Sequence, residues 1–185
     1  MMRVVDWSRW LWSGRPQSLL MLAALLMVGA LTFAAQTWAT PPSGVVLNQI
    51  LASGLAPDAI SQHMQVHRNV DGTKAPWQLQ LQVQGDTDYY SQHLVLAPGG
   101  YSGWHSHPGL LIGAVSSGQI DFYNANCETV SIGPGQVFSE DDKVHAIINT
   151  GGVEADLYIS YLVKHGQPRR REEAAPPCAI DTPIP

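Results

Sequence analysis

Short strand-like runs separated by glycine and proline dominate the chain from Trp77 onward, and they constrain the fold more than any other feature. In residues 77–83 every second residue is apolar and the residues between are glutamines, which is typical of a half-buried strand with a polar outer face. The other expected strands are 89–97, 110–116, 119–123, 128–132, 136–138, 144–149 and 155–163. No convincing amphipathic helix lies between them, so the pattern predicts an all-β sandwich or barrel.

The stretch before these strands has a less regular pattern. Residues 40–44 read as a short linker. Gly54, Pro57 and Asp58 interrupt residues 47–65, which therefore predict a strand, a turn and one helical turn rather than a long helix.

The composition of the 185-residue chain suits one folded domain rather than two. Apolar residues make up 45% and charged residues 14%, which favours a packed core over a disordered chain. The net charge is -5. Without the first 39 residues, which hold three arginines and one aspartate, the remainder is more acidic still. Such a surface repels phosphate backbones, so nucleic acid is not an expected partner.

The N-terminus reads as a targeting segment. Residues 18–35 form an uncharged apolar run that follows Arg3, Arg9 and Arg15, and no further lysine or arginine occurs until Arg68. This charge bias places the N-terminus in the cytoplasm and the rest of the chain across the membrane. Residues 1–39 are either a signal peptide cleaved after Ala39 or an uncleaved membrane anchor. Both alternatives predict a periplasmic or secreted domain that meets the membrane only through this segment.

Three histidines form the most informative constellation. His105 and His107 are two residues apart in a glycine-rich stretch, so in an extended chain their imidazoles project to the same face. His145 lies in an apolar strand, where a histidine bonds to a neighbour or binds something. Two imidazoles on one face can hold one metal ion at about 2.0 to 2.1 Å. The sequence therefore predicts a site for one divalent transition metal on His105, His107 and His145.

These residues carry a family resemblance. The sequence resembles the first cupin motif at Gly99, which is followed after five residues by His105-Ser106-His107 and later by Gly118. It resembles the second cupin motif at Gly135, which is followed by His145 and Asn149. The surrounding sequence is similar to small single-domain cupins with a type-2 conserved barrel. The resemblance implies a double-stranded β-helix, or jelly roll, with the metal in its mouth. The strand pattern extends this domain over residues 45–164, and the Pro-rich composition of residues 165–185 indicates an irregular tail. The resemblance also implies a homodimer paired through sheet edges.

The sequence departs from the family pattern in the second motif, where Asp141-Asp142-Lys143 replaces the usual Pro-x-Gly turn, and after the histidine pair of the first. A glutamate usually follows the histidine pair after three or four residues, but Leu111 and Ile112 stand there. Leu111 shares the parity of the histidines and is expected to face inward. A replacement carboxylate can come from Glu140, Asp141 or Asp142, although a solvated acidic turn is the favoured interpretation of these three. The missing carboxylate leaves the metal its full charge, as in the three-histidine iron centres of some cupin dioxygenases.

The metal and its ligand are less specified. Imidazole suits Fe, Zn, Ni and Cu, and Mn is a further candidate metal. Such a site favours small molecules that chelate through carboxylate, enolate or thiolate groups. His93, Trp104 and Leu111 are candidates for the ligand-binding wall. His93 has an outer-face position as an equal alternative, and Trp104 has plain core packing as the favoured one. His63 and His67 have a spacing that can hold zinc on a helix, but without the metalloprotease glutamate.

Cys127 and Cys178 are the only cysteines, and they do not form a Cys-x-x-Cys motif. In an oxidising compartment a disulfide between them is the leading interpretation, with two free thiols as the alternative. The bridge would hold the Pro-rich tail against the barrel.

Three functions remain open at this point. The first is a metal-dependent oxidoreductase of the dioxygenase kind, acting on a small chelating substrate. The second is a non-catalytic module that binds a small ligand, and the third is a structural or metal-storage role. Candidate groups for binding a carboxylate are Arg68, Lys74, Lys143, Lys164 and the tail arginines at 169–171.

Overall fold

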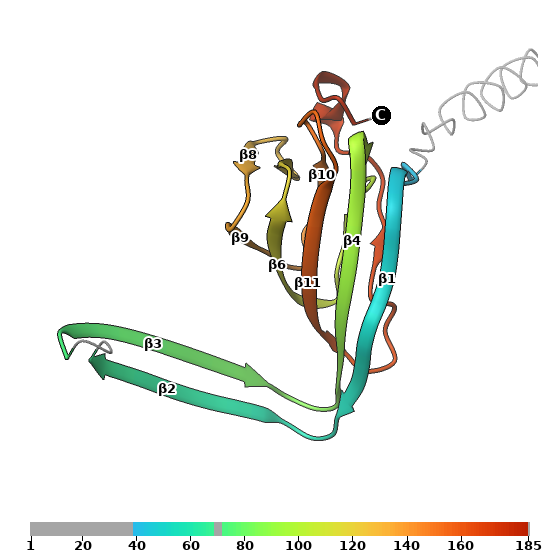
Figure 1. Cartoon of the computed structure of the whole chain (residues 1–185). Coiled ribbons are helices and arrows are strands. Elements are labelled where there is room, and N and C mark those ends of the chain that lie inside the picture. The colour runs from blue at the N-terminus through green and yellow to red at the C-terminus, as the bar shows by residue number, and fades with distance from the viewer. Residues whose placement is uncertain (1–38, 69–71, 185) are drawn as a thin grey trace, which may run out of the picture. The chain divides into compact units, whose positions relative to one another are not determined.

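The computed structural model describes residues 39–68 and 72–184 (Figure 1). The targeting segment expected over residues 1–39 lies, apart from Ala39, outside them. Within the described ranges no helix is long and apolar enough to cross a membrane. The elements are β1 (Ser43–Ala56), β2 (Ile60–Arg68), β3 (Lys74–Val83), β4 (Thr87–Tyr101), β5 (His105–Ser106), β6 (Gly109–Ser117), β7 (Ile120–Asn124), β8 (Thr129–Ile132), β9 (Val137–Glu140), β10 (His145–Ile148), β11 (Ala155–Lys164), β12 (Arg171–Glu172) and the 3₁₀ helix η1 (Pro177–Asp181).

Ten of the strands form one sheet that curls into a nearly closed barrel, which confirms the predicted all-β jelly-roll architecture. The long strand β4 pairs antiparallel with β1 on one side and with β11 on the other. β11 continues to β6 and then β9, while β10 joins β4, β5 and β7. The curl brings β5, β9 and β10, which carry the predicted site and its acidic flank, around one space.

The barrel is filled by alternating side chains, as the period-two pattern requires. On β11 the residues alternate between buried and more exposed positions along the strand. The buried set packs with residues of β4, β6, β7 and β10 in one core, which includes Leu96, Leu111, Val115, Ile120 and Leu157. This core forms the apolar floor and walls beneath the histidines.

The strands β2 and β3 form a separate two-stranded hairpin. The expected strand at 77–83 exists, but its apolar face is not half-buried, since Trp77 is 52% and Leu79 is 41% exposed. The reason is that, within residues 39–68 and 72–184, β3 pairs only with β2 and lies outside the sheet of the barrel. The helical turn expected within 47–65 is also wrong, because the turn between β1 and β2 leads directly from strand to strand.

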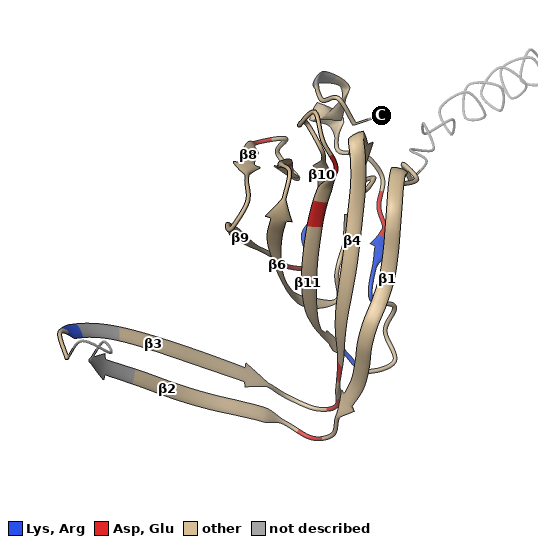
Figure 2. Ribbon diagram, in the orientation of Figure 1, with Lys and Arg blue, Asp and Glu red and all other residues tan. Residues whose placement is uncertain are grey.

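Strand β1 is long, uncharged and open to solvent along most of its length (Figure 2). It pairs only with β4 among the described residues, and Val46, Leu51 and Leu55 on it are about half-exposed. In the described part of the chain, charged side chains lie on turns, on the tail and on other strands such as β11.

The tail is more ordered than the irregular segment expected from its sequence. β12 pairs with β5, placing Arg171 opposite Ser106 and Glu172 opposite His105. Cys127 and Cys178 form a disulfide, as predicted. This bridge is compatible with an oxidising location outside the cytoplasm. The tail is thereby fixed beside the strand that carries the first histidine.

Candidate metal centre

Strand register brings the three predicted histidines together. His105 on β5 is the direct cross-strand partner of His145 on β10. His107 follows β5 immediately, and all three side chains are buried. The ring centroids lie 4.4 Å apart for His105 and His145, 4.9 Å for His105 and His107, and 5.2 Å for His107 and His145. The imidazoles therefore meet at one point, as the sequence predicted.

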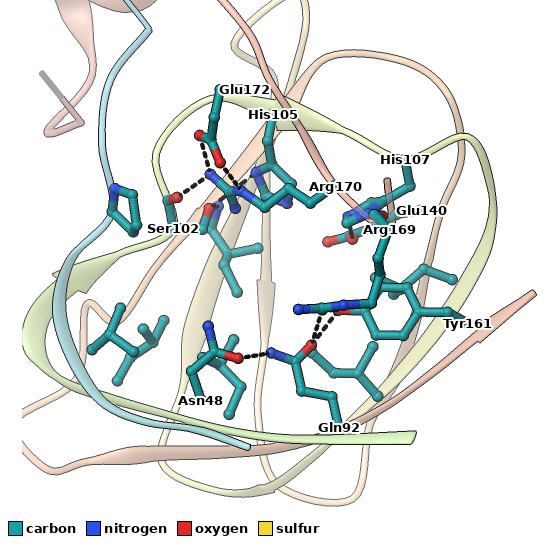
Figure 3. Close-up of a pocket in the computed structure, with 17 residues that line it drawn as sticks. Asn48, Gln92, Ser102, His105, His107, Glu140, Tyr161, Arg169, Arg170 and Glu172 are labelled. Atoms are coloured by element: carbon teal, nitrogen blue, oxygen red, sulfur yellow. Dashed lines mark hydrogen bonds and ion pairs between the residues drawn. The ribbon is translucent and has the colours of Figure 1, made fainter. Parts of the chain in front are cut away.

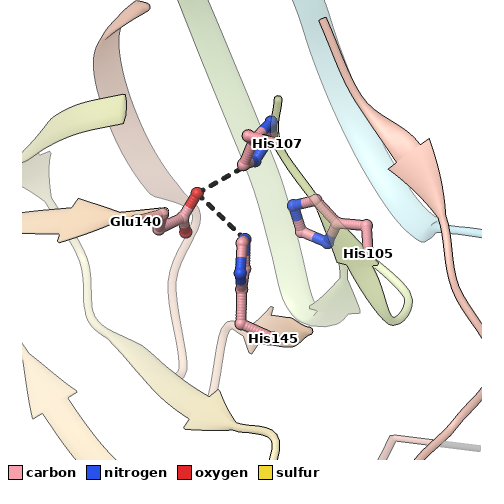
Figure 4. A group of neighbouring side chains, drawn as sticks. All are labelled: His105, His107, Glu140 and His145. Atoms are coloured by element: carbon pink, nitrogen blue, oxygen red, sulfur yellow. Dashed lines mark ion pairs between the residues drawn. The ribbon is translucent and has the colours of Figure 1, made fainter. Parts of the chain in front are cut away.

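A fourth residue completes the group, and here the sequence interpretation was wrong. Glu140, at the end of β9, is buried and points its carboxylate at the histidines (Figure 4). Its Oε2 lies 3.1 Å from Nε2 of His107 and 3.1 Å from Nε2 of His145. One ligand atom from each of the four residues lies within 4.8 Å of the other three. The predicted solvated acidic turn begins only at Asp141, which pairs with Lys143 at the surface.

The outer nitrogen of each imidazole is fixed by a backbone carbonyl. His105 Nδ1 donates to Gly103 O at 2.9 Å, His107 Nδ1 to Arg169 O at 2.8 Å, and His145 Nδ1 to Lys143 O at 2.7 Å. A carbonyl only accepts, so Nδ1 carries the proton in each ring and Nε2 presents a lone pair to the centre. This is the arrangement that orients histidine ligands in metal sites.

The carbonyl beneath His105 depends on a glycine. Gly103 has a φ of +72°, and a Cβ on it would lie 2.0 Å from the carbonyl oxygen of Thr40. Only glycine fits both the left-handed backbone and this close approach. The glycine-rich stretch before the histidine pair therefore has a local structural reason.

The Nε2 atoms of His107 and His145 are buried without any hydrogen bond. Their contacts with Glu140 at 3.1 Å lack hydrogen-bond alignment and set lone pairs against a carboxylate. Buried polar atoms are rarely left without a partner, and a cation between these groups would satisfy all of them at once. The donor set of three imidazoles and one carboxylate thus fits a divalent transition metal.

The electrostatics of the group agree with this geometry. Burial, together with the neighbouring His145 and Arg170, lowers the pKa of His105 well below its ordinary value, so its ring is neutral at neutral pH. A neutral imidazole and an ionised carboxylate are the forms that bind metal.

A cavity of about 190 Å³ opens beside the cluster (Figure 3). His105, His107 and Glu140 line it together with Leu111, whose predicted inward position is found. Further apolar lining comes from Leu94, Leu96, Ile147 and Ile159. The polar lining includes Gln92, Tyr161, Arg169 and Arg170. The sequence offered the tail arginines only as candidates among several cations, because nothing in it shows that the tail folds back to the barrel mouth.

The other expected ligand-wall residues lie elsewhere. His93 does not line the cavity, since its neighbours Gln92 and Leu94 face inward and alternate residues of a strand face opposite ways. It contacts Asp156 at 2.8 Å and stacks on Tyr158. Trp104 is fully buried in a separate core with Ala179 and Ile184 of the tail. Asn149 is structural, as expected, and donates to the carbonyls of Leu96 and Val153.

The second histidine pair shows no such convergence. His63 on β2 contacts Gln78 across the hairpin, and the side chain of His67 lies outside the described part of the structure. Because β2 is a strand, the helical spacing considered for this pair does not apply.

Comparison with protein families bears directly on this barrel. Residues 92–161, which include all four residues of the cluster, match the family model of the cupin domain. The chain contains a cupin domain. The match runs from the middle of β4 to β11 and so covers all four residues of the cluster, while part of the cavity lining comes from β1 and from the tail.

Solved structures overlap this cupin chain only in part. An oxalate oxidase aligns at 23% identity over 40% of this chain and 41% of its own, with a TM-score of 0.37. A sugar phosphate isomerase of the cupin superfamily from Silicibacter pomeroyi aligns at 17% identity over 41% and 51%, with a TM-score of 0.38. An uncharacterised protein with a double-stranded β-helix domain from Klebsiella pneumoniae aligns at 14% over 62% and 84%, with a TM-score of 0.40.

The chain spans about two fifths of the length of the oxalate oxidase that it matches. Because these structural alignments cover only part of each chain, they support no conclusion about activity. No curated protein matches the chain in sequence.

Proposed function

We propose that this cupin domain binds one divalent transition metal through His105, His107, His145 and Glu140, and acts as a metal-dependent oxidoreductase on a small chelating substrate. The observation that carries the proposal is the pair of buried imidazole nitrogens that face the Glu140 carboxylate without a hydrogen bond. Such an arrangement is costly unless a cation lies between the groups.

The chemistry of the centre follows from its charge. Glu140 contributes one negative charge, so a divalent ion would keep a net charge of about +1 rather than the full +2 of a three-histidine site. When bound, the metal would polarise an oxygen donor of the substrate and supply a redox-active ion if it is Fe or Mn. Backbone carbonyl groups orient the histidine side chains of the cluster. Three of the four cluster residues, His105, His107 and Glu140, line the cavity.

The apolar side chains of the cavity wall exclude water from the cluster. Leu94, Leu111 and Ile159 line the cavity beside the cluster, and its volume of about 190 Å³ suits a small molecule. A drier surrounding strengthens every charge interaction of the centre, because fewer water molecules screen it.

A non-catalytic binding module is the second candidate, and one observation favours it. Among the described lining residues, no side chain outside the cluster is placed to exchange a proton near neutral pH. Glu172 is engaged with Arg170. Burial raises the pKa of Tyr161 to about 12, despite the opposing effect of Arg169. Any catalysis here must therefore depend on the metal itself and on the substrate's own acidity.

Metal analysis of the full-length protein tests the proposal. We expect close to one metal per chain in the parent and a large loss in His145→Ala and Glu140→Ala. The matched control is His63→Ala, because His63 is exposed on the hairpin and should leave the metal content unchanged. A parent protein that stays folded and metal-free after exposure to Fe(II), Mn(II) and Zn(II) would contradict the metal site. Oxygen uptake by the Fe(II) form with small carboxylic acids then separates an oxidoreductase from a binding module.

A further inference from the structure

The geometry points to a second anchor in the same cavity: Arg169, on the tail, binds the carboxylate of a small dicarboxylate whose other end reaches the metal centre. This inference rests on the proposed function for the metal but concerns a residue outside the cluster. It names both the substrate class and the role of a segment that follows the barrel.

The tail is built to hold this arginine at the cavity. The chain turns back after β11, and the carbonyl of Arg169 accepts the hydrogen bond from His107 Nδ1 at 2.8 Å. Two residues later β12 pairs with β5, and Ser106 Oγ donates to Glu173 at 2.6 Å. The backbone of Arg169 is therefore fixed by the same residue that supplies a candidate ligand, and its side chain extends into the cavity (Figure 3).

The guanidinium of Arg169 has no anionic partner among the described residues. Its Nη1 donates to Gln92 Oε1 at 2.7 Å and to the hydroxyl oxygen of Tyr161 at 3.0 Å, both of which are neutral. No carboxylate lies within 4.0 Å of it, and Nε and Nη2 make no hydrogen bond to the described chain. A half-buried arginine without a counter-charge is an unusual arrangement that favours an external anion.

The neighbouring arginine shows the contrast. Arg170 Nε and Nη2 donate to the two carboxylate oxygens of Glu172 at 2.5 and 2.7 Å, and Nη2 also donates to Ser102 O. This fork-to-fork pair neutralises Arg170 and uses its donors. Of the two cations that line the cavity, only Arg169 therefore keeps an unbalanced charge.

Neutral side chains pre-position the Arg169 fork. Its guanidinium carbon lies 4.9 Å from the centre of the Tyr161 ring, and the Tyr161 hydroxyl donates to Gln92 Oε1. Gln92 is itself held by Asn48, because Gln92 Nε2 donates to Asn48 Oδ1 at 2.6 Å. The Tyr161 hydroxyl stays protonated at neutral pH because burial raises its pKa, so it offers Arg169 no negative charge.

The charge balance of the cavity defines the ligand. A divalent metal with Glu140 carries about +1, and Arg169 adds +1 at a second point of the same cavity. A dianion with two separated carboxylates matches these two centres, and the apolar lining suits the carbon atoms between them. The ring of His107, a member of the cluster, lies 5.4 Å from that of Tyr161 beneath the arginine, so a short molecule can approach both.

Calorimetric titration of the full-length, metal-loaded protein tests this inference, with malonate and succinate as dicarboxylates, propionate as a monocarboxylate and malonamide as an uncharged analogue. We expect Arg169→Ala to weaken dicarboxylate binding about 10- to 100-fold, the usual cost of losing a charged hydrogen-bond partner. Propionate binding should change far less. Because the substitution keeps the backbone carbonyl, metal content should match the parent. The matched control is Arg171→Ala, an exposed arginine on the same tail that should bind dicarboxylates like the parent.

Two outcomes would overturn the inference: equal dicarboxylate affinity in Arg169→Ala and Arg171→Ala, or a parent that binds dicarboxylates no more tightly than malonamide. Metal content measured on the same samples separates this failure from failure of the proposed function. If no metal binds, but malonate still binds in an Arg169-dependent way, the arginine anchor stands and the metal proposal falls. Arg169→Lys sharpens the result, since a lysine keeps the charge but loses the planar fork.

Discussion

Leu111 on β6 and Glu140 on β9 are direct cross-strand partners. Leu111 stands where the cupin resemblance leads one to expect a carboxylate, and Glu140 brings a carboxylate to the histidines from the adjacent strand. The side chains of both residues line the same cavity. The strand next to β6 thus supplies the carboxylate that the resemblance leads one to expect on β6 itself.

This relationship predicts that the carboxylate can be moved back. Glu140→Leu should lower metal affinity by at least about tenfold, since even losing a residue that merely supports a ligand costs that much. The exchange variant Leu111→Glu with Glu140→Leu should recover a substantial part of the loss. The new carboxylate would start from the position directly opposite residue 140 on the neighbouring strand. Competition titration with a chromophoric chelator measures both affinities.

The control for this exchange is Leu111→Glu alone. It places two carboxylates in one buried site and should destabilise the metal-free protein, because like charges there cannot both ionise without cost. If the exchange variant binds metal no better than Glu140→Leu, a carboxylate at residue 111 cannot replace the one at residue 140, and the prediction is wrong.

Much of this centre was predictable from local patterns, and the rest depends on strand pairing. His105 and His107 share a face because they are two residues apart, and His145 stood out as a polar residue in an apolar strand. Glu140 gave no such signal, because in sequence it is the first of three acidic residues before Lys143 and looks like a turn. Only the register of β6 against β9 shows that Glu140 is buried while Asp141 faces solvent.

The same limit applies at the ends of the domain. The alternation in residues 77–83 correctly predicted a strand, but alternation does not tell whether a second layer covers the apolar face, and here Trp77 remains exposed. The tail has no periodic pattern, yet Arg169 reaches the cavity because β12 pairs with β5 over two residues. Such short pairings depend on tertiary context rather than on propensity.

Metal binding should stabilise the folded protein. A ligand that binds only the native state at 100 times its dissociation constant adds about 2.7 kcal/mol to the free energy of unfolding. For a chain of this size that corresponds to a rise in Tm of roughly 5 to 10 °C. Differential scanning calorimetry with and without excess metal should show this rise in the parent and in His63→Ala. If His145→Ala shows the same rise, the stabilising metal binds elsewhere.

The surface pair of His165 and Asp88 predicts a pH-dependent contribution to stability. His165 Nδ1 lies 2.8 Å from Asp88 Oδ1, and this contact raises the pKa of His165 above 6.5 and lowers that of Asp88 below 3.8. The histidine contribution is fully present below pH 6.5 and is lost as pH rises through the raised pKa. The aspartate contribution is present above pH 3.8 and is lost as pH falls through the lowered pKa.

The difference in unfolding free energy between the parent and His165→Ala should therefore be largest between pH 3.8 and pH 6.5 and should shrink on either side. Urea unfolding across this pH range measures it, and Asp88→Asn should give the same window. A difference that stays constant above pH 8 would mean that the two charges do not interact in the folded protein.

The disulfide should contribute a large share of the stability of the tail. It joins Cys127 and Cys178 across a separation of 51 residues, for which the chain-entropy model gives about 4 kcal/mol at 25 °C. We expect Cys127→Ser with Cys178→Ser to lower the free energy of unfolding by up to about that amount in urea titration. The reduced parent protein should behave like the double variant, which separates loss of the bridge from the effect of the serines. The tail keeps its pairing with β5 and the bond between Ser106 and Glu173, so metal content should survive at moderate temperature. If the metal is lost together with the bridge, the carbonyl of Arg169 is no longer orienting His107, and the cystine rather than β12 holds the tail at the cavity.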